Sequence, residues 1–405
     1  VAFYEKTAAG VLAAFDAALA QAPNLAALHL DRGNTLHDLG RDEEAIAAFD
    51  RTLALAPDDA DAFTCRGNAE RNLMRLDAAA ADHRRALALE PDNIEARWNL
   101  ALVELLAGDF ANGWRDYEER WRRRAMRGQP QYSSAPLWLG EPSLAGKSIL
   151  LVAEQGLGDT IQFCRYAPLV AERGAKVTLA VPKALAPLVA TMKGAVSFTT
   201  TDEPPPAADF QVPLMSLPLA FGTTVETVPA AVPYLFADPK RQAAWHEKLG
   251  ENRRPRIGLC WSGRAGLAPD RHRSMPAQSL APLLALPFEF HSLQKEIRPA
   301  DRETLKAFPH VETHTDELGD FADTAALIAE MDLTVSVDTS IAHAVGALGR
   351  PLWLLPPLMP EWRWLTDRTD SPWYPTARLF RRRGTEGWDG VVAAVAEALK
   401  AEFRI

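Results

Sequence analysis

The feature that most constrains the fold is a 34-residue repeat in the first third of the 405-residue chain. The segments "FDAALAQAPN" (15–24), "FDRTLALAPD" (49–58) and "HRRALALEPD" (83–92) align without gaps. In each segment a helical stretch ends just before a proline, which cannot continue a helix. Units of this length form helix–turn–helix pairs, and the pairs stack into a curved solenoid. We therefore expect an α-solenoid over residues 1–127.

Two asparagines occupy equivalent places in successive units. Asn34 and Asn68 lie on the first helices of their units, where side chains face the concave groove. The groove of a helical solenoid often binds peptides, and an amide side chain both donates to and accepts from a peptide backbone. Polar residues at this place also serve helix packing. Asn34 and Asn68 are therefore candidate peptide-binding residues, with helix packing as the alternative.

After the repeats the pattern changes to alternating strands and helices. Residues 128–147 are rich in proline, glycine and serine, which favours a connector. The strand "SILLVAE" (148–154), a helical stretch and the strand "KVTLAV" (176–181) then form a parallel βαβ unit. The segments "DFQVPL" and "YLFA" (234–237) are two further candidate strands.

A second strand–helix series begins at "RIGLCWSG" (256–263) and continues to "PLWLL" (351–355). Two such series predict two doubly wound, Rossmann-like halves with a cleft between them. The predicted fold class is therefore an α-solenoid followed by an α/β unit of two halves. The predicted boundaries are 1–127 for the repeat array, 128–147 for the linker, 148–240 for the N-terminal half, 241–387 for the C-terminal half and 388–405 for a C-terminal helix.

The first candidate site is "GLGDT", directly after the strand 148–154. A dinucleotide fingerprint requires a third glycine and an acidic residue at the end of the second strand, and both are missing. We expect Gly156 and Gly158 to free the turn, which leaves Asp159 two possible roles. It caps the following helix, or it faces the cleft between the halves as a general base.

The second candidate site is "SVDTSIAH", where a strand ends at Asp338 and a helix begins near Thr339 and Ser340. Unpaired backbone N–H groups at a helix start attract phosphate, and the two hydroxyl groups add donors. His343 lies on the first turn of the same helix. The segment is either a phosphate site or a helix cap with a packed histidine, and the residues alone favour neither.

Two further segments of the second half supply candidate donor-binding residues. Gly263 and Arg273 follow the strand that begins at "RIGLC", and basic side chains there can neutralise a pyrophosphate. Arg264 and Arg271 lie in the same segment. In "FHSLQKE", Gln294 stands at the end of a strand, where its amide can read a nucleotide base.

Composition and spacing exclude several classes of protein. The net charge of −9 does not favour nucleic acid, and no apolar run is long enough to span a bilayer. The first residues lack a signal-peptide core, and three widely spaced cysteines fit a reducing cytoplasm. The segment "HVETH" (310–314) holds two histidines but no clear third ligand, so we predict no metal site.

The ordered motifs "GLGD", "RIGLCWSG", "RSMP" and "DTSIAH" resemble those of the heptosyltransferase-type GT-B glycosyltransferases, glycosyltransferase family 9. With tetratricopeptide repeats before them, the whole chain resembles bacterial repeat-fused glycosyltransferases, including flagellin glycosyltransferases. It is also similar in layout to O-GlcNAc transferase, which grips peptides with an asparagine ladder. The resemblance implies inverting transfer of a sugar from a nucleotide sugar, without metal or other cofactor. The acceptor is then a Ser or Thr hydroxyl of a protein recruited by the repeats, with flagellin as one candidate.

The resemblance also implies roles for residues. Asp159 falls on the family's catalytic aspartate, and residues 338–343 fall on its phosphate-binding motif, where Ser340 replaces the usual glycine. Arg273 falls on a position where a lysine is usual. In such proteins the last helix crosses back to the first half. Two other functions stay open: a non-catalytic, repeat-based binding scaffold, and a nucleotide-sugar epimerase.

Overall fold

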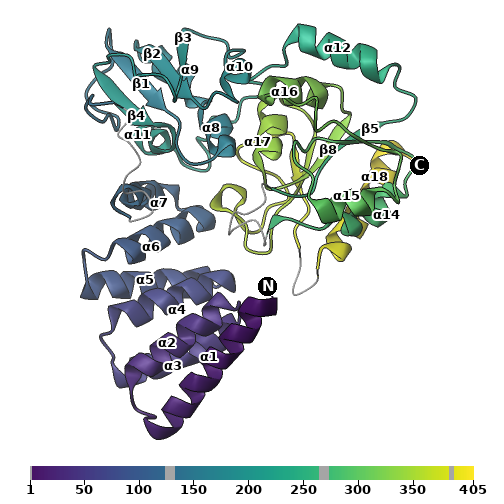
Figure 1. Cartoon of the computed structure of the whole chain (residues 1–405). Coiled ribbons are helices and arrows are strands. Elements are labelled where there is room, and N and C mark those ends of the chain that lie inside the picture. Colours follow the sequence, from purple (N-terminus) through teal and green to yellow (C-terminus); the bar gives the residue numbers. More distant parts are fainter. Residues whose placement is uncertain (1, 124–132, 264–272, 383–386) are drawn as a thin grey trace. The chain divides into compact units, whose positions relative to one another are not determined.

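The computed structural model describes residues 2–123, 133–263, 273–382 and 387–405, with side chains described from residue 9 (Figure 1). Contacts divide the chain into two compact units, Val1–Gln129 and Pro130–Ile405. The predicted fold class, helical repeats followed by a parallel α/β unit of two halves, is confirmed. The finer predicted boundaries stay predictions. No helix in the described part of the chain is long and apolar enough to cross a membrane.

The repeat unit is built from helices that pack against their neighbours in chain order. These are α1 (Ala2–Gln21), α2 (Ala26–Asp38), α3 (Asp42–Leu55), α4 (Ala60–Asn72), α5 (Leu76–Leu89), α6 (Ile94–Ala107) and α7 (Phe110–Tyr117), followed by the short 3-10 helix η1 (Glu118–Arg122).

Glycines at the repeat spacing allow the two helices of a unit to touch. A Cβ atom at Gly33 on α2 would lie 2.4 Å from the ring of Phe49 on α3. One repeat later, a Cβ atom at Gly67 on α4 would lie 2.8 Å from the ring of His83 on α5. The repeat therefore places the same glycine–ring contact in both units, with a histidine in the place of a phenylalanine.

The first half of the α/β unit is a parallel sheet in the order β3-β2-β1-β4. Its strands are β1 (Ser148–Val152), β2 (Lys176–Val181), β3 (Val196–Thr200) and β4 (Phe210–Pro213), and its helices are α8 (Leu157–Phe163), α9 (Tyr166–Glu172), α10 (Ala186–Val189), η2 (Leu214–Ser216) and α11 (Leu217–Ala220). Two residues of the predicted connector contact this half: Leu137 forms a bridge to Gln211, and Trp138 is buried.

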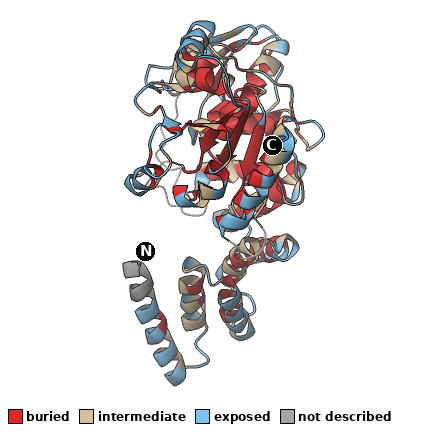
Figure 2. Ribbon diagram, turned by 90° about the vertical axis from the view of Figure 1, so that its right-hand side faces the viewer, coloured by how far each residue is buried: buried red, intermediate tan, exposed pale blue. Residues whose placement is uncertain are grey.

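The second half is a larger parallel sheet in the order β10-β9-β8-β5-β6-β7, and Figure 2 shows the buried residues concentrated in the α/β unit. Its strands are β5 (Arg256–Cys260), β6 (Glu289–Ser292), β7 (Val311–Thr313), β8 (Leu333–Val337), β9 (Leu352–Leu355) and β10 (Ala377–Leu379). Its helices are α12 (Pro239–Leu249), η3 (Ala277–Leu280), α14 (Ala281–Leu284), α15 (Pro299–Leu305), α16 (Phe321–Ala329), α17 (Ser340–Ala347), η4 (Trp362–Trp364) and α18 (Trp388–Phe403).

Two expectations about this unit are wrong. Residues 234–237 form no strand; the backbone N–H groups of Tyr234 and Leu235 instead donate to the carbonyl of Ala347, at the end of α17. The last helix, α18, packs on the second half, because its apolar face joins the core cluster around β5 and β6, with Val395 and Leu399 fully buried. Residues 388–405 therefore belong to the second half rather than crossing to the first.

Candidate active site at the junction of the two α/β halves

The segment "GLGDT" forms the start of α8, directly after β1. The positive φ of the turn belongs to Gln155 (φ 59°), whereas Gly156 has φ −92° and precedes the helix. Asp159 reaches back and accepts a hydrogen bond from the Gly156 backbone N–H at 2.7 Å. A Cβ atom at Gly156 would lie 2.9 Å from that carboxylate. The expectation that the two glycines free the turn is therefore wrong, because Gly156 leaves room for the carboxylate instead.

Gly158 serves a contact between the two halves. A Cβ atom there would lie 2.7 Å from the ring of His343 and 3.4 Å from the Cα atom of Ser340, both on α17. Because α8 follows β1 and α17 follows β8, the carboxyl ends of these two strands face one junction. The two motifs that the sequence identified separately are neighbours in the structure.

Arg363 ties this junction together, and sequence reasoning missed it. Its guanidinium is buried and donates to Asp159, to Oε1 of Gln162 at 2.6 Å and to Oε2 of Glu361 at 2.6 Å. The residue lies on η4, in the segment between β9 and β10. Nothing adjacent in sequence points to the pairing, since 204 residues separate Arg363 from Asp159.

The tryptophans of the same segment pack the fold. Trp364 and Trp373 are fully buried and Trp362 is nearly so. Trp364 stacks on His343 with ring centroids 5.6 Å apart. These rings therefore pack in the interior beside the junction and do not offer an exposed surface on which a sugar could stack.

Asp338 is a buried carboxyl at the end of β8. Burial, and then the negative charge of Glu361, raise its pKa to about 6, against the opposing positive charges of Arg363 and Arg273. Thr339 caps α17 by accepting from the Ile341 N–H at 3.3 Å. Ser340, the first residue of α17, remains partly exposed.

His343 is buried and held by one strong hydrogen bond. Its Nδ1 lies 2.8 Å from the hydroxyl of Tyr374, and its Nε2 lies 3.9 Å from Oδ1 of Asp338. Burial, and then the charges of Arg363 and other arginines, holds the pKa of His343 well below its ordinary value. The ring is neutral at pH 7, so its approach to Asp338 is no ion pair.

Gln294 has a different environment from the one that the sequence suggested. Its amide oxygen accepts from the backbone N–H groups of Trp261 and Ser262 at 2.7 and 2.9 Å. Its amide nitrogen donates to the hydroxyl of Ser262 and the carbonyl of Glu296. The amide therefore ties the loop after β5 to the segment after β6, and no part of it is left to read a nucleotide base.

The remaining predicted residues of the second half lie along the same loop. The Gly263 backbone N–H donates to the hydroxyl of Ser274 at 3.0 Å. Arg273 is close enough to Asp338 and His343 for its charge to lower both pKa values. Arg264 and Arg271 lie outside the described residues.

The two predicted peptide-binding asparagines lie in the repeat unit. Asn34 on α2 and Asn68 on α4 are both partly buried. The side-chain oxygen of Asn68 is buried and accepts no hydrogen bond from the described residues. This oxygen can still accept a hydrogen bond. Among the described residues, Asn34 has no buried side-chain atom that lacks a partner.

Comparison with known proteins gives one repeat-family match and one curated relative. Residues 33–73 match the TPR repeat family. Over 328 residues the chain is 28% identical to Protein FlbA of Caulobacter vibrioides, an alignment that covers 74% of this chain and 54% of FlbA. The chain thus spans about half the length of the curated relative that it matches.

Solved structures resemble the two units separately. The E. coli ADP-heptose lps heptosyltransferase II is 16% identical, with a TM-score of 0.43, and the match covers 63% of this chain and 99% of that one. The MamA protein is 25% identical, with a TM-score of 0.28, and the match covers 29% of this chain and 64% of that one.

Proposed function

We propose that this protein is an inverting, metal-independent glycosyltransferase that moves a sugar from a nucleotide-sugar donor to a Ser or Thr hydroxyl of a protein recruited by the repeats. The observation that carries the proposal is the junction of α8 and α17. It places Gly158, the residue before Asp159, against Ser340 and His343 of the second half, and Arg363 of the second half donates to Asp159. In open α/β sheets, ligands bind outside the carboxyl ends of the strands, which is where both segments lie.

The second half supplies the donor site in this proposal. The first backbone N–H groups of α17 are suited to the diphosphate of a nucleotide sugar. Partly exposed Ser340 adds a hydroxyl donor, and Arg273 adds a positive charge nearby. A fixed cation and oriented N–H groups stabilise the leaving diphosphate without a metal ion.

Asp159 is the general base in this proposal. The acceptor oxygen attacks the anomeric carbon as the bond from that carbon to the diphosphate oxygen breaks, and Asp159 takes the acceptor proton. Because Arg363 holds one carboxylate oxygen, that contact must open for the acceptor to approach, while the Gly156 N–H keeps the other oxygen in place. A positioned base of this kind contributes roughly 10²–10⁴ in rate.

The decisive experiment is Asp159→Asn in the full chain. We expect nucleotide-sugar binding in a thermal-shift screen to be retained and sugar transfer to a protein acceptor to fall by roughly 10²-fold or more. Asp202→Asn, an exposed aspartate of the same half, is the matched control and should transfer at the wild-type rate. Wild-type transfer by Asp159→Asn would remove this residue as the base.

A non-catalytic binding scaffold is the second candidate. The engagement of both Asp159 oxygens and of the whole Gln294 amide favours it, because these groups already have partners within the protein. The same thermal-shift screen distinguishes a glycosyltransferase from a scaffold. A scaffold gives no shift with any nucleotide sugar and still binds its protein partner.

A further inference from the structure

A cluster of metal-ligand side chains lies at the edge of the second sheet, formed by His291 on β6, Glu312 on β7 and His314 just after β7. Nδ1 of His291 is 3.2 Å from Nε2 of His314 and 3.8 Å from a carboxylate oxygen of Glu312. The three ligand atoms all lie within 4.8 Å of one another. Among the described residues, this is the one group of three such side chains that converges in this way.

We propose that His291, Glu312 and His314 form a binding site for a divalent transition-metal ion, for which Zn²⁺ is the natural probe. The site goes beyond the proposed sugar transfer, which uses residues of other segments. Two imidazole nitrogens and one carboxylate oxygen are a ligand set that suits zinc, with water as a fourth ligand.

The distances fit the coordination of such an ion. Zinc ligands lie about 2.0–2.1 Å from the metal, so neighbouring ligand atoms of a tetrahedral site are about 3.3–3.4 Å apart. The two histidine nitrogens already stand at 3.2 Å, and Glu312 needs a small movement to join them. Glu312 can make that movement because its side chain is 61% exposed on the edge strand β7.

Both histidines are prepared for this role by their surroundings. Each ring is buried, which fixes its position, and a neutral imidazole binds a metal ion through the lone pair of either ring nitrogen, according to its tautomer. Nδ1 of His314, on the other side of its ring, lies 3.8 Å from a carboxylate oxygen of Glu317. At this distance there is no hydrogen bond, but a carboxylate that closes on the far nitrogen of a ligating histidine orients its ring.

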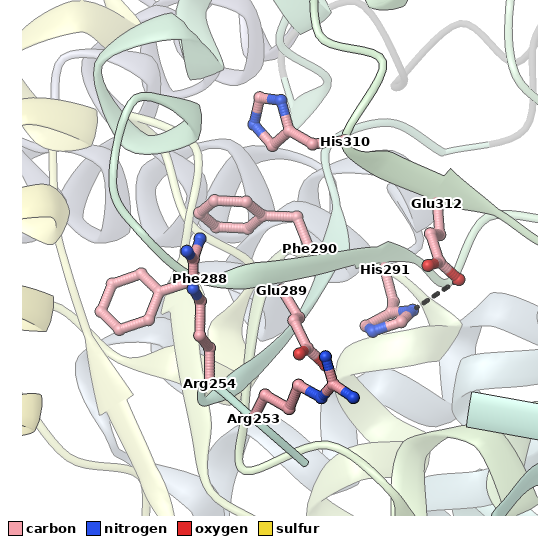
Figure 3. Close-up of a pocket in the computed structure, with 8 residues that line it drawn as sticks. All are labelled: Arg253, Arg254, Phe288, Glu289, Phe290, His291, His310 and Glu312. Atoms are coloured by element: carbon pink, nitrogen blue, oxygen red, sulfur yellow. Dashed lines mark ion pairs between the residues drawn. The ribbon is translucent and has the colours of Figure 1, made fainter. Parts of the chain in front are cut away.

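Solvent reaches the cluster through a neighbouring pocket. His291 and Glu312 line a pocket of about 290 Å³, drawn in Figure 3 with their close approach dashed. A water molecule can therefore complete the coordination. His310 lines the same pocket but stands apart, beside Phe290, and its Nε2 is 2.9 Å from the carbonyl of Leu284.

The segment "HVETH" by itself holds two histidines four residues apart and no clear third ligand. The folded chain differs from this pattern in two ways. His310 points away, and the missing ligand is His291, which β6 brings alongside because His291 pairs with Glu312 in the parallel register.

The test is zinc titration of the full chain, first freed of metal with a chelator, by calorimetry and by its Tm. We expect wild type to bind one tight equivalent that raises the Tm. His314→Gln should lose this equivalent. Glu312→Gln, an exposed position where the fold is not at risk, should bind about tenfold more weakly or worse, since even partners one step removed from a metal cost about 10–100-fold.

His310→Gln is the matched control and should bind zinc as wild type does. The absence of a tight equivalent in wild type would overturn the proposal. So would zinc affinity that is the same in wild type, Glu312→Gln and His314→Gln. If His314→Gln fails to fold by circular dichroism, the comparison of Glu312→Gln with His310→Gln decides the question.

Discussion

Two helix contacts in this protein pair a glycine with a histidine ring, but the surroundings of the two histidines differ. In the repeat unit, Gly67 on α4 faces the ring of His83; at the junction of the α/β halves, Gly158 on α8 faces the ring of His343. Both histidines are buried. His83 stands where the preceding unit has Phe49, and neither of its ring nitrogens finds a partner among the described residues.

His343 differs in what surrounds it. Its ring is hydrogen-bonded to Tyr374, close to Asp338 and stacked on Trp364. A buried histidine without partners fills space, whereas one within a satisfied polar network fixes the geometry of that network. A glycine–histidine contact therefore does not by itself indicate a functional site. The polar groups around the ring of His343 are what mark the candidate site.

The largest expected effect comes from removing Arg363, the buried cation at the same junction as His343. Arg363→Ala leaves Asp159, Glu361 and Gln162 without their shared donor. The guanidinium is buried, with 6% of its side chain exposed, but both carboxylates retain some access to water. We therefore expect a loss of about 3 kcal/mol in the free energy of unfolding, at the lower end for a broken buried pair.

Urea unfolding of the full chain measures this loss. Arg368→Ala, which removes an exposed arginine paired with Asp370 in the same segment, is the control and should cost about 1 kcal/mol or less. If the two variants lose the same free energy of unfolding, the ion pairs at the junction contribute no more than surface pairs. The contrast drawn with the unpartnered His83 would then be wrong.

The second prediction places the same substitution in both contacts. Gly158→Ala puts a methyl group against His343 and the start of α17, and Gly67→Ala puts one against His83. Both overpack a tight contact, at a cost of about 1–3 kcal/mol. Only Gly158→Ala displaces the proposed donor site, so its transfer rate should fall about 10²-fold, as for a misplacement of about 1 Å.

Transfer and nucleotide-sugar binding assays on the two variants separate these effects. Gly67→Ala should retain donor binding, with any loss confined to stability. If both glycine variants lower donor binding to the same extent, the junction has no special role in holding the donor.

Much of the fold could be predicted because its signals are local. The repeat is visible from segments 34 residues apart, and the βαβ units follow from apolar runs separated by helical stretches. The placement of "GLGDT" and "DTSIAH" at the carboxyl ends of strands follows from the same patterns, but their contact does not, because the two strands belong to different sheets. The strand at 234–237 was wrong because its backbone groups bond to the end of α17, a tertiary contact that no local pattern reveals.

The site itself was predictable only in part, for the same physical reason. Asp159 and Asp338 stand beside glycines and hydroxyls in recognisable motifs. Arg363 becomes significant only when η4 meets α8, and His291 only when β6 pairs with β7. Gln294 looked like a ligand-binding group because its backbone partners lie more than 30 residues away in sequence.

The smallest expected effect concerns the unpartnered histidine of the repeats and pH. Burial lowers the pKa of His83 to about 3, whereas the unfolded chain has an ordinary value of about 6.5. Below pH 6.5 the unfolded state therefore binds a proton that the folded state does not, so stability falls as the pH falls from 6.5 towards 3. Between pH 7.5 and pH 5 this one residue should cost about 2 kcal/mol.

His83→Phe restores the side chain of the preceding repeat and should remove that cost. Chemical unfolding at pH 7.5 and pH 5, in wild type and variant, measures it as a stability difference that grows by about 2 kcal/mol on acidification. A difference between wild type and His83→Phe that is the same at both pH values would mean that His83 takes up a proton in the folded state as readily as in the unfolded state, and that its ring is not sealed from water.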